Sequence, residues 1–588
     1  MKKTKIVSTL GPASNTLDII TQLIESGANV FRFNFSHGDH EEQLARMTLV
    51  REAVKNVGKD VAILLDTKGA EIRTTVQATE SGKLAFEIGD VVRISMDASL
   101  EGTKEKIAVT YPGLYDDVIV GGHVLFDDGL IDMQITEKDD VNKELVTVVK
   151  NAGLLGSRKG VNAPGVSISL PGITEKDAED IRFGCDNDID FIAASFVRKA
   201  QDVLDIREIL EEKNMTHVQI FSKIESQEGI DNIDEILKVS DGIMVARGDM
   251  GVEIPAEFVP MVQKNIIKKC NAAGKAVITA TQMLESMQHN PRPTRAEASD
   301  VANAVFDGTD ATMLSGESAN GEYPVEAVST MARIDIEAEK ALNNLGTFQI
   351  NQFDKTDVTE TIGLSVARAA KNLNVKCIVA ATESGHTAKM ISKYRPDADI
   401  LAVTFDERTK RGLMLNWGVY PTVTEKPKTT DEMFELATKK AVELGFAKEG
   451  DLIIITAGVP VGERGTTNVM KVQLIGSKLI EAQGVGERAV VANAVVAKNA
   501  EDAIAKAQDG MVLVVPTTDK EYMPAIDKAA ALVVEDGGLT SHAAVVGIAK
   551  DLPVIVGAKG ATNTIKDGEL ITVDSRRGIV YRGETTAI

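Results

Sequence analysis

The sequence predicts an α/β protein built on a (β/α)₈ TIM barrel. Eight short apolar or β-branched runs are mostly separated by stretches with helical spacing, and polar residues gather where the runs end. The runs span residues 4–10, 29–35, 61–66, 190–196, 218–224, 242–247, 276–281 and 311–316. Parallel strands that are buried on both faces and alternate with helices are typical of this barrel, whose active sites lie at the carboxyl ends of its strands.

A long insertion separates the third run from the fourth. Residues 70–170 contain alternating runs such as VVRISM and LVTVVK, a turn signal at 127–129 and no strong helical period. We therefore expect an inserted β-barrel lid domain here, with the catalytic barrel formed by residues 1–69 and 171–344. A domain attached over the catalytic rim could close, exclude water and bring groups of its own to the site, including the segment 157–165.

The alternation of strands and helices restarts near residue 345. The segment 345–474 contains the strand-like runs CIVAAT, ILAVTF and LIIITAG, and the loop ESGHT follows the first of them. A strand followed by a Ser/Thr/Gly loop and a helix is typical of phosphate sites, so we expect an α/β allosteric domain. Residues 475–588, with IKDGELITVD and GGLTSHAAVVGIA, form a further C-terminal domain.

Composition excludes several classes of protein. A chain of 588 residues and 63.0 kDa is too long for a single core. No apolar run is long enough to span a bilayer, and the N-terminal segment lacks signal-peptide features, so we expect a cytoplasmic protein without membrane contact. A net charge of −22 argues against nucleic-acid binding. The widely spaced Cys185, Cys270 and Cys377 support neither disulfides nor a zinc site.

Charged residues that end two neighbouring runs predict a phosphoryl-transfer or enolate site. Lys223 and Glu225 end one run in a Lys-x-Glu pattern, and Asp249 follows the next in Ala-Arg-Gly-Asp. The two carboxylates suit Mg²⁺, or Mn²⁺, as hard oxygen ligands. An ammonium beside them can stabilise a developing oxyanion or a moving phosphoryl group.

Both segments resemble the metal-binding motifs of the pyruvate kinase family. The resemblance continues, in the family's order, through RFNFSHG (32–38), LLDTKGAEIRT (64–74), ITATQMLESM (278–287), NPRPTRAEASDVANAVFDGTDA (290–311) and LSGES (314–318). It covers roughly the first 475 residues. The tail is similar to the phosphohistidine domain of phosphoenolpyruvate-utilising enzymes, through GGLTSHAAVVG. The departures are Ala70 for Pro, Ser226 for Asn and Met250 for Leu, none of which removes a charged ligand.

The resemblance implies transfer of a phosphoryl group from phosphoenolpyruvate to ADP, giving ATP and pyruvate. Positioning and electrostatics then do most of the catalysis. Implied catalytic residues are Lys223, Arg32, Arg73, Thr281 and Ser315, with Thr281 and Ser315 on the proton-delivery side. Implied substrate contacts are Arg32, Lys223, Gly248, Asp249 and Thr281, and implied nucleotide contacts are Arg73, Lys159, Asn34, Pro12 and His37. Glu225 and Asp249 would hold Mg²⁺, and a second Mg²⁺ would arrive with the nucleotide.

A monovalent cation site is implied by the same resemblance. Its ligands would be Asn34, Ser36, Asp66 and the carbonyl of Thr67, an all-oxygen set that suits K⁺. In the family, a Glu at the position of Glu71 accompanies K⁺ dependence, whereas K⁺-independent members carry Lys there. We therefore expect this chain to depend on K⁺.

The third domain resembles the family's effector-binding domain. Thr382, Ser384, Gly385, His386 and Thr387 match its phosphate loop, and Trp417 and Arg464 match the rest of that pocket. The resemblance implies a homotetramer regulated by a phosphorylated metabolite, with ribose 5-phosphate, AMP and fructose 1,6-bisphosphate as candidates. The alternative, a strand-to-helix turn that is satisfied within the fold, stays open.

Two other functions remain open at this point. A Mg²⁺-enolate lyase or aldolase would share Lys223, Glu225 and Asp249, but not the K⁺ ligands or the nucleotide-facing lid. The tail could instead be a phosphocarrier or interaction module, with His542 in LTSHAAVV at the position of the phosphorylated histidine. We favour a histidine that only begins a helix, because a likeness of fold confers no activity by itself and the chain lacks a recognisable nucleotide-grasp domain.

Overall fold

The computed structural model describes residues 1–345, 358–459, 467–476 and 478–584. These fall into two compact units. Residues 1–355, 392–395 and 406–421 make up the first unit, and residues 356–391, 396–405 and 422–588 make up the second.

Eight parallel strands close into a barrel in the order β1-β17-β16-β15-β14-β13-β3-β2. Their bounds are β1 (Lys5–Thr9), β2 (Val30–Asn34), β3 (Ala62–Asp66), β13 (Phe191–Ala194), β14 (Gln219–Ile224), β15 (Gly242–Ala246), β16 (Ala276–Ala280) and β17 (Ala311–Leu314). Each strand lies within one of the eight apolar runs, so the predicted (β/α)₈ barrel is confirmed. All carboxyl ends of the strands therefore lie on one rim.

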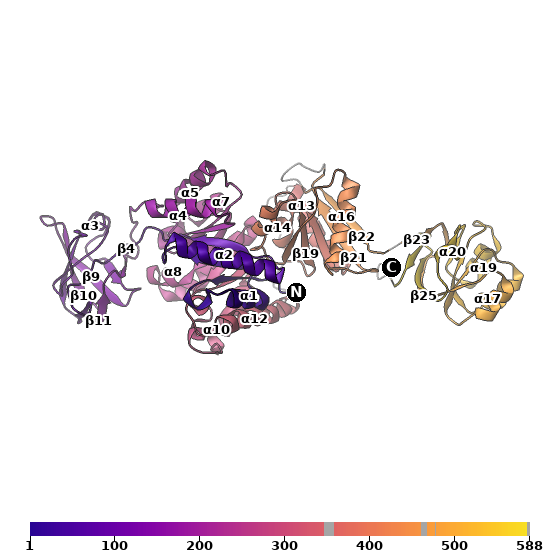
Figure 1. Cartoon of the computed structure of the whole chain (residues 1–588), viewed down its shortest axis with the longest axis horizontal. Helices are drawn as coiled ribbons and strands as arrows, with labels where there is room; N and C mark the ends of the chain where they lie inside the picture. The colour runs from indigo at the N-terminus through magenta and orange to yellow at the C-terminus, as the bar shows by residue number, and fades with distance from the viewer. Residues whose placement is uncertain (346–357, 460–466, 477, 585–588) are drawn as a thin grey trace. The chain divides into compact units, whose positions relative to one another are not determined.

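Helices follow the strands and cover the outside of the barrel (Figure 1). Two begin with reciprocal capping boxes, at Thr174 with Asp177 and at Thr294 with Glu297, which satisfy the free N–H groups of the first turn. Their bounds are α1 (Leu17–Ser26), α2 (His40–Val57), α4 (Glu175–Asp186), α5 (Ala200–Glu212), α6 (Gln227–Asp231), α7 (Ile233–Val239), α8 (Arg247–Glu253), α9 (Val259–Ala273), α10 (Arg295–Asp307), α11 (Gly316–Ala319) and α12 (Pro324–Leu345), with short 3₁₀ turns η1 (Pro12–Ser14), η2 (Ala256–Phe258) and η3 (Glu285–Gln288).

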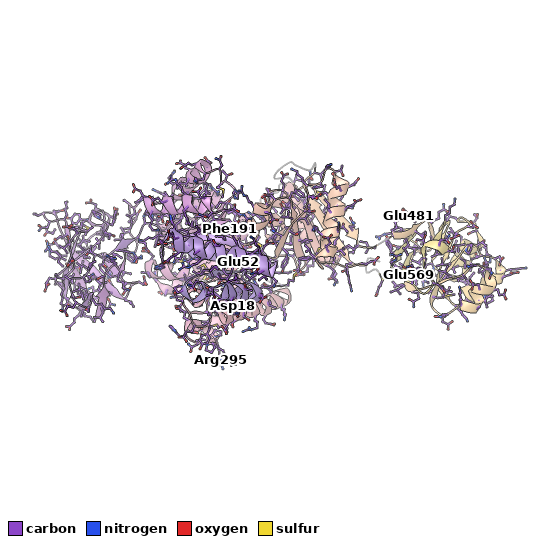
Figure 2. The ribbon with its side chains drawn as sticks, in the orientation of Figure 1. Asp18, Glu52, Phe191, Arg295, Glu481 and Glu569 are labelled. Atoms are coloured by element: carbon purple, nitrogen blue, oxygen red, sulfur yellow. The ribbon has the colours of Figure 1, made fainter. Side chains whose placement is uncertain are left out.

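Apolar side chains fill the barrel and the layer between its strands and the helices. Phe191 is completely buried and packs edge-on against Phe221 in the cluster that also contains Met414 and Leu415. In contrast, Asp18 on α1 and Glu52 on α2 are exposed (Figure 2). The filled interior makes the barrel a rigid platform for the side chains on its rim.

The insertion forms a curled β domain. Its sheet has the order β4-β12-β8-β9-β10-β6-β7, and β11 pairs with β5 in a separate ribbon. The edges β4 and β7 are joined beyond their ends, because Thr74 bridges Val109 and the N–H of Thr110 donates to the carbonyl of Arg73 at 2.8 Å. The bounds are β4 (Ile72–Arg73), β5 (Lys83–Phe86), β6 (Val91–Ser95), β7 (Lys106–Ala108), α3 (Leu114–Asp117), β8 (His123–Phe126), β9 (Ile131–Asp139), β10 (Glu144–Val149), β11 (Gly153–Gly156) and β12 (Gly160–Asn162). The predicted β lid is therefore confirmed.

The third domain is an α/β sheet with the order β20-β19-β18-β21-β22. Strands β18, β19 and β21 are parallel, and the edge strand β22 is antiparallel. The bounds are α13 (Val358–Asn372), β18 (Cys377–Ala381), α14 (His386–Ser392), β19 (Asp399–Thr404), α15 (Glu407–Gly412), β20 (Val419–Val423), α16 (Thr430–Glu443), β21 (Leu452–Ala457) and β22 (Val469–Leu474). The strand order reverses between β18 and β21, where open α/β sheets bind ligands.

The tail has its own mixed sheet, with the order β23-β30-β29-β25-β26-β27-β28-β24. Strands β25 to β28 are parallel, and the flanking strands are antiparallel. The bounds are β23 (Lys478–Glu481), β24 (Gln483–Val485), β25 (Ala489–Val496), α17 (Ala500–Lys506), β26 (Met511–Val515), η4 (Lys520–Tyr522), α18 (Met523–Ile526), β27 (Ala529–Val534), α19 (His542–Lys550), β28 (Val554–Val556), α20 (Ala561–Thr564), β29 (Leu570–Asp574) and β30 (Ile579–Arg582). It is the additional domain that the sequence predicts.

Two expectations from composition concern the cysteines and membrane-spanning helices. Cys185, Cys270 and Cys377 are all buried and unbridged, and burial raises the pKa of the Cys185 thiol to about 11. They therefore act as small apolar side chains. Within the described part of the chain, no helix has both the length and the apolar character needed to cross a membrane.

Candidate active site

Four charged side chains form a continuous network on the carboxyl-terminal rim of the barrel. Arg32 on β2 donates through Nε to Oδ2 of Asp66 at the end of β3. The ammonium of Lys223 on β14 lies 3.2 Å from Oδ1 of the same aspartate and 3.0 Å from Oε1 of Glu225. Asp66 and Glu225 are each 1% exposed, so the network is almost completely removed from water. The barrel thus brings together residues that are far apart in the sequence.

The pKa values within this network follow from burial and ion pairing. Burial raises the pKa of Asp66, but the cations of Arg32 and Lys223 outweigh it and leave that pKa below its ordinary value. Burial lowers the pKa of Lys223, whereas Asp66 and Glu225 raise it to a net value above the ordinary one. Lys223 is therefore a permanently charged cation. Burial, reinforced by the charge of Asp249, raises the pKa of Glu225 to about 7.

The carboxylates fit a hard divalent cation. Glu225 follows β14, and Asp249 lies in the first turn of α8, immediately after β15. Within the described ranges, no hydrogen bond or ion pair to a protein group occupies the Asp249 carboxylate. Two neighbouring carboxylates, one of them with a raised pKa, are stabilised in the charged form when a divalent cation replaces the proton.

Ser195 and the backbone of Phe196 complete the network, and sequence reasoning gave neither a role. The Ser195 hydroxyl receives a hydrogen bond from Lys223 Nζ at 2.8 Å and lies 2.6 Å from the carbonyl of Thr67. The N–H of Phe196 donates to Glu225 Oε2 at 2.6 Å, from a backbone with φ of 54°. Ser195 ends a predicted strand, but only its neighbours in space distinguish it from any other polar residue at a strand end.

The proposed K⁺ ligands lie next to this network. Asn34 pairs in register with Asp66, and its Oδ1 accepts the N–H of Ser36 at 3.0 Å. Gln43 on α2 fixes the loop by donating to the carbonyl of Asn34 at 3.1 Å. With the carbonyl of Thr67, these groups supply oxygen atoms of the kind a hard monovalent cation binds. Binding of K⁺ by these groups stays a prediction.

Thr281 is held in an unusual conformation after β16. Its φ is 67°, which a β-branched residue rarely adopts. Its hydroxyl donates to the carbonyl of Ala280 at 2.6 Å and accepts the N–H of Gly248 at 2.7 Å. The predicted substrate-binding residue Gly248 therefore contacts Thr281 directly in this structure.

Ser315 belongs to a separate set of contacts. Its N–H donates to Glu317 Oε2 at 2.8 Å, and the other oxygen of this completely buried carboxylate accepts the N–H of Leu284 at 3.0 Å. In the described ranges no direct hydrogen bond joins Ser315 to Thr281. A proton network through both residues would therefore need a water molecule between them.

The lid carries paired acidic and basic side chains. Arg73 forms an ion pair with Glu71 at 2.7 Å, and Lys159 forms one with Asp127 at 2.9 Å. Burial raises the pKa of Asp128, and the charge of Asp249 raises it further. A cavity of about 330 Å³ lies between lid and barrel. Its walls include Glu71, Asp128, Asn162, Arg198, Glu225 and Asp249.

The remaining residues that are predicted to bind the nucleotide lie on the barrel. Pro12 opens the 3₁₀ turn η1 and is exposed, as is the side chain of His37. The carbonyl of His37 accepts a hydrogen bond from Gln43 at 2.8 Å. Their role as nucleotide contacts stays a prediction.

The predicted effector loop follows β18. Gly385 has φ of 83°, and its N–H donates to Thr382 Oγ1 at 3.0 Å. The hydroxyl of Thr387 on α14 lies 2.8 Å from that of Thr467, and Ser384 is exposed. These residues lie at the strand-order reversal between β18 and β21.

The other two predicted effector contacts, Trp417 and Arg464, stay predictions. Trp417 is buried against the side chains of Lys3 and Arg395, and its N–H donates to Asp310 at 3.1 Å. Its described contacts are thus with the barrel unit. Arg464 lies outside the described residues.

His542 is the first residue of α19 in the tail. Ser541 caps the helix, and His542 Nδ1 lies 3.3 Å from Thr518 Oγ1. This contact agrees with the interpretation that His542 begins a helix and hydrogen-bonds to a neighbouring loop. It also leaves the imidazole partly exposed.

Comparisons with known proteins agree with this architecture. The family model described as "Pyruvate kinase, barrel domain" matches residues 1–328, and "Pyruvate kinase, alpha/beta domain" matches residues 360–473. "PEP-utilising enzyme, mobile domain" matches residues 507–578.

Similar proteins include pyruvate kinases from Lactobacillus delbrueckii subsp. bulgaricus (62% identity over 589 residues), Geobacillus stearothermophilus (57% over 588) and Bacillus licheniformis (56% over 589). In each case the alignment covers 100% of both chains. With a barrel-domain match over more than half its length and full-length relatives of this similarity, the chain belongs to the pyruvate kinase family.

Proposed function

We propose that this chain transfers the phosphoryl group of phosphoenolpyruvate to ADP, using the rim network around Lys223. The observation that carries the proposal is a permanently charged, buried ammonium between two carboxylates at the carboxyl ends of parallel strands. Such a preorganised cation stabilises charge that develops during reaction without reorganising solvent. A lyase or aldolase would not need the adjoining K⁺ ligands or the basic side chains of the lid.

The reaction needs cations in the site because both substrates are polyanions. Lys223 contacts the transferring phosphoryl group and the oxygen that becomes the enolate, and Arg32 and Arg73 bind phosphate oxygens through their guanidinium forks. An ADP oxygen forms a bond to phosphorus while the bond between phosphorus and the enol oxygen breaks. The electron pair of that bond remains on the enolate, where Lys223 stabilises it.

Glu225 and Asp249 would hold Mg²⁺, or Mn²⁺, against the substrate. When bound, the metal supplies Lewis-acid stabilisation of the phosphoryl and enolate oxygens. Asn34, Ser36, Asp66 and the Thr67 carbonyl would hold K⁺. The glycine N–H at 248 and the start of α8 would bind the substrate carboxylate once Thr281 releases that N–H.

Protonation of the enolate completes the reaction. A proton from solvent is added to the carbon of the enolate, and the carbonyl of pyruvate is restored. Thr281 is proposed to orient the water that delivers this proton, because a hydroxyl alone is a weak acid. Ser315 would extend the same path through water.

Nucleotide binding is proposed to involve both lid and barrel. Arg73 and Lys159 lie on the lid, and Asn34, Pro12 and His37 lie on the barrel. In this structure Arg73 and Lys159 form ion pairs with Glu71 and Asp127. ADP phosphates would compete for these cations, and lid closure would remove water from the reacting groups.

Regulation and assembly are also proposals. The loop Thr382–Thr387 supports binding of a phosphorylated metabolite such as ribose 5-phosphate, AMP or fructose 1,6-bisphosphate. The pyruvate kinase relationship supports a cytoplasmic homotetramer. We also propose the domain boundaries given above for the catalytic barrel, the lid, the allosteric domain and the tail. Coupling between the effector and active sites would then be reciprocal in binding free energy.

Lys223→Met should lower kcat by at least about 10³-fold, because the lost charge acts mainly in the transition state. Because Lys223 is buried between two carboxylates, its removal should also lower thermal stability. Steady-state rates are compared with phosphoenolpyruvate binding by fluorescence, and Lys223→Arg controls for charge. A folded Lys223→Met variant with more than a tenth of the wild-type rate would contradict the assignment.

Replacing K⁺ with tetramethylammonium at constant ionic strength should strongly depress activity, since that ion cannot enter an oxygen-lined site. Glu71→Lys should partly relieve the dependence by supplying a positive charge. Glu71→Gln is the matched control, because it breaks the same ion pair with Arg73 without adding a cation. Equal wild-type rates with and without K⁺ would rule out the K⁺ assignment.

Ser384→Ala with Thr387→Ala should abolish activation by the effector and leave the maximal rate nearly unchanged. The two hydroxyls lie far along the chain from the catalytic groups and would bind only the effector phosphate. Rates are measured against phosphoenolpyruvate with a panel of sugar phosphates and nucleotides, and Ser365→Ala on α13 is the control. A normal response of the double variant would locate the pocket elsewhere.

His542→Ala should have little kinetic effect, and deletion of residues 475–588 should leave basal catalysis measurable while changing stability or the effector response. The competing phosphocarrier function is favoured by the match of residues 507–578 to the mobile domain of phosphoenolpyruvate-utilising enzymes. Incubation with ³²P-labelled phosphoenolpyruvate distinguishes the two. An acid-labile label on the full-length chain that His542→Ala removes would establish the phosphocarrier instead.

A further inference from the structure

Arg247 joins the end of β15 to the strained turn after β16. It precedes Gly248 and Asp249 in the chain, and its side chain is only 10% exposed. Through Nη2 it donates to the carbonyl of Thr281 at 2.6 Å, and through Nε to that of Ala280 at 3.2 Å. One guanidinium therefore binds two consecutive carbonyls of the turn that carries Thr281.

The turn has a conformation that its own sequence does not favour. Thr281 and Gln282 have φ values of 67° and 54°, in the left-handed region that glycine adopts readily and threonine rarely does. Such strain persists only where surrounding contacts impose it, and it is frequent at functional sites. The two hydrogen bonds from Arg247 are contacts of this kind.

The guanidinium is itself fixed from its outer side. Its Nη1 lies 2.7 Å from Asp300 Oδ1 on α10 and 3.4 Å from Gln263 Oε1 on α9. A planar fork held by a carboxylate at one edge can present its other N–H groups in a fixed direction. Lysine, a single point donor on a flexible stem, could not hold the two carbonyls and Asp300 with the same geometry.

The contacts of the Thr281 hydroxyl depend on the same clamp. The carbonyl of Ala280 accepts hydrogen bonds from both Arg247 Nε and the Thr281 hydroxyl. The N–H of Gly248, the next residue after Arg247, donates to Thr281 Oγ1. Arg247 thus sets the position of the hydroxyl through its side chain and through the backbone that follows it. When the substrate carboxylate takes the N–H of Gly248, as proposed above, the two guanidinium contacts to the carbonyls of Ala280 and Thr281 still hold the turn.

We propose that Arg247, anchored by Asp300, is a positioning residue for Thr281 that keeps its hydroxyl aligned for protonation of the enolate. The inference rests on the proton-delivery role proposed above for Thr281. Arg247 touches neither substrate nor metal in this scheme. Its loss should therefore slow the proton step much more than it weakens binding of phosphoenolpyruvate.

The proton step can be measured alone, as exchange of the methyl protons of pyruvate in D₂O with Mg²⁺, K⁺ and ATP present, followed by NMR. In this exchange a C–H bond of pyruvate breaks to give the enolate, and a C–D bond forms from solvent. Arg247→Lys should slow exchange by about tenfold or more, the size of effect expected when a charged hydrogen bond is lost. The KM for phosphoenolpyruvate should change by less than about threefold.

A double-mutant cycle tests whether Arg247 acts through Thr281. In a Thr281→Ala background, Arg247→Lys should slow exchange by no more than about twofold, because the group that it positions is absent. The matched control is Arg207→Lys on α5, an arginine that similarly contacts a carbonyl, of Val239, and a carboxylate, of Asp241. It should leave exchange unchanged. If Arg247→Lys does not fold, Asp300→Asn carries the same expectations from outside the turn.

Three other outcomes of these experiments would contradict the positioning role of Arg247. Normal exchange in Arg247→Lys together with slow exchange in Thr281→Ala would overturn this inference alone. Normal exchange in Thr281→Ala would overturn the proton-delivery role of Thr281, and with it the positioning role built upon it. An equal effect of Arg247→Lys with and without Thr281 would show that Arg247 acts by another route and would also overturn the inference.

Discussion

The buried ion network of Arg32, Asp66, Lys223 and Glu225 is the interaction on which the active site depends. Each charge would be costly in the barrel by itself, and each is tolerated because an opposite charge lies within hydrogen-bonding distance. The network in turn fixes the ammonium that we propose stabilises the transferring phosphoryl group. Backbone N–H and hydroxyl groups satisfy the remaining oxygen atoms, so the side chains have little freedom to rearrange.

The barrel makes this network possible because it brings several strand ends to one rim. A parallel sheet closed on itself aligns the carboxyl ends of β2, β3 and β14, which come from separate parts of the chain. The close-packed apolar interior beneath them, which includes Phe191 and Phe221, supports the rim. The same closure places the loops after β15 and β16 side by side, where Arg247 reaches Thr281.

The lid and the rim differ in how firmly their charges are held. Lys223 is buried and permanently paired, whereas Arg73 and Lys159 on the lid are partly exposed and bound to acidic neighbours of the lid itself. Exchange of such exposed pairs for phosphate oxygens costs little free energy. In the proposed reaction, a fixed cation on the rim and exchangeable cations on the lid suit an enzyme that must also release a polyanionic product.

The sequence by itself determined the strands, the insertion and most of the charged site. Apolar runs bounded by polar residues located all eight barrel strands, because burial on both faces demands continuous apolar sequence. The motif order also predicted that Lys223, Glu225 and Asp249 lie together, and in the structure they are neighbours on the rim. The spacing of residues along the chain was sufficient to predict which side chains lie on the rim wherever those side chains directly follow a barrel strand.

Only the tertiary structure decided the contacts that cross between strands. The hydrogen bond of Ser195 to Lys223, the left-handed backbone of Thr281 and the reach of Arg247 across two loops depend on register and side-chain direction, which residue order does not encode locally. The contacts of the Trp417 ring with Lys3 and Arg395, which are distant from it in the sequence, are a further example. The physical reason is that a side chain's partners are set by closure of the whole barrel, whereas its sequence neighbours set only its strand or helix.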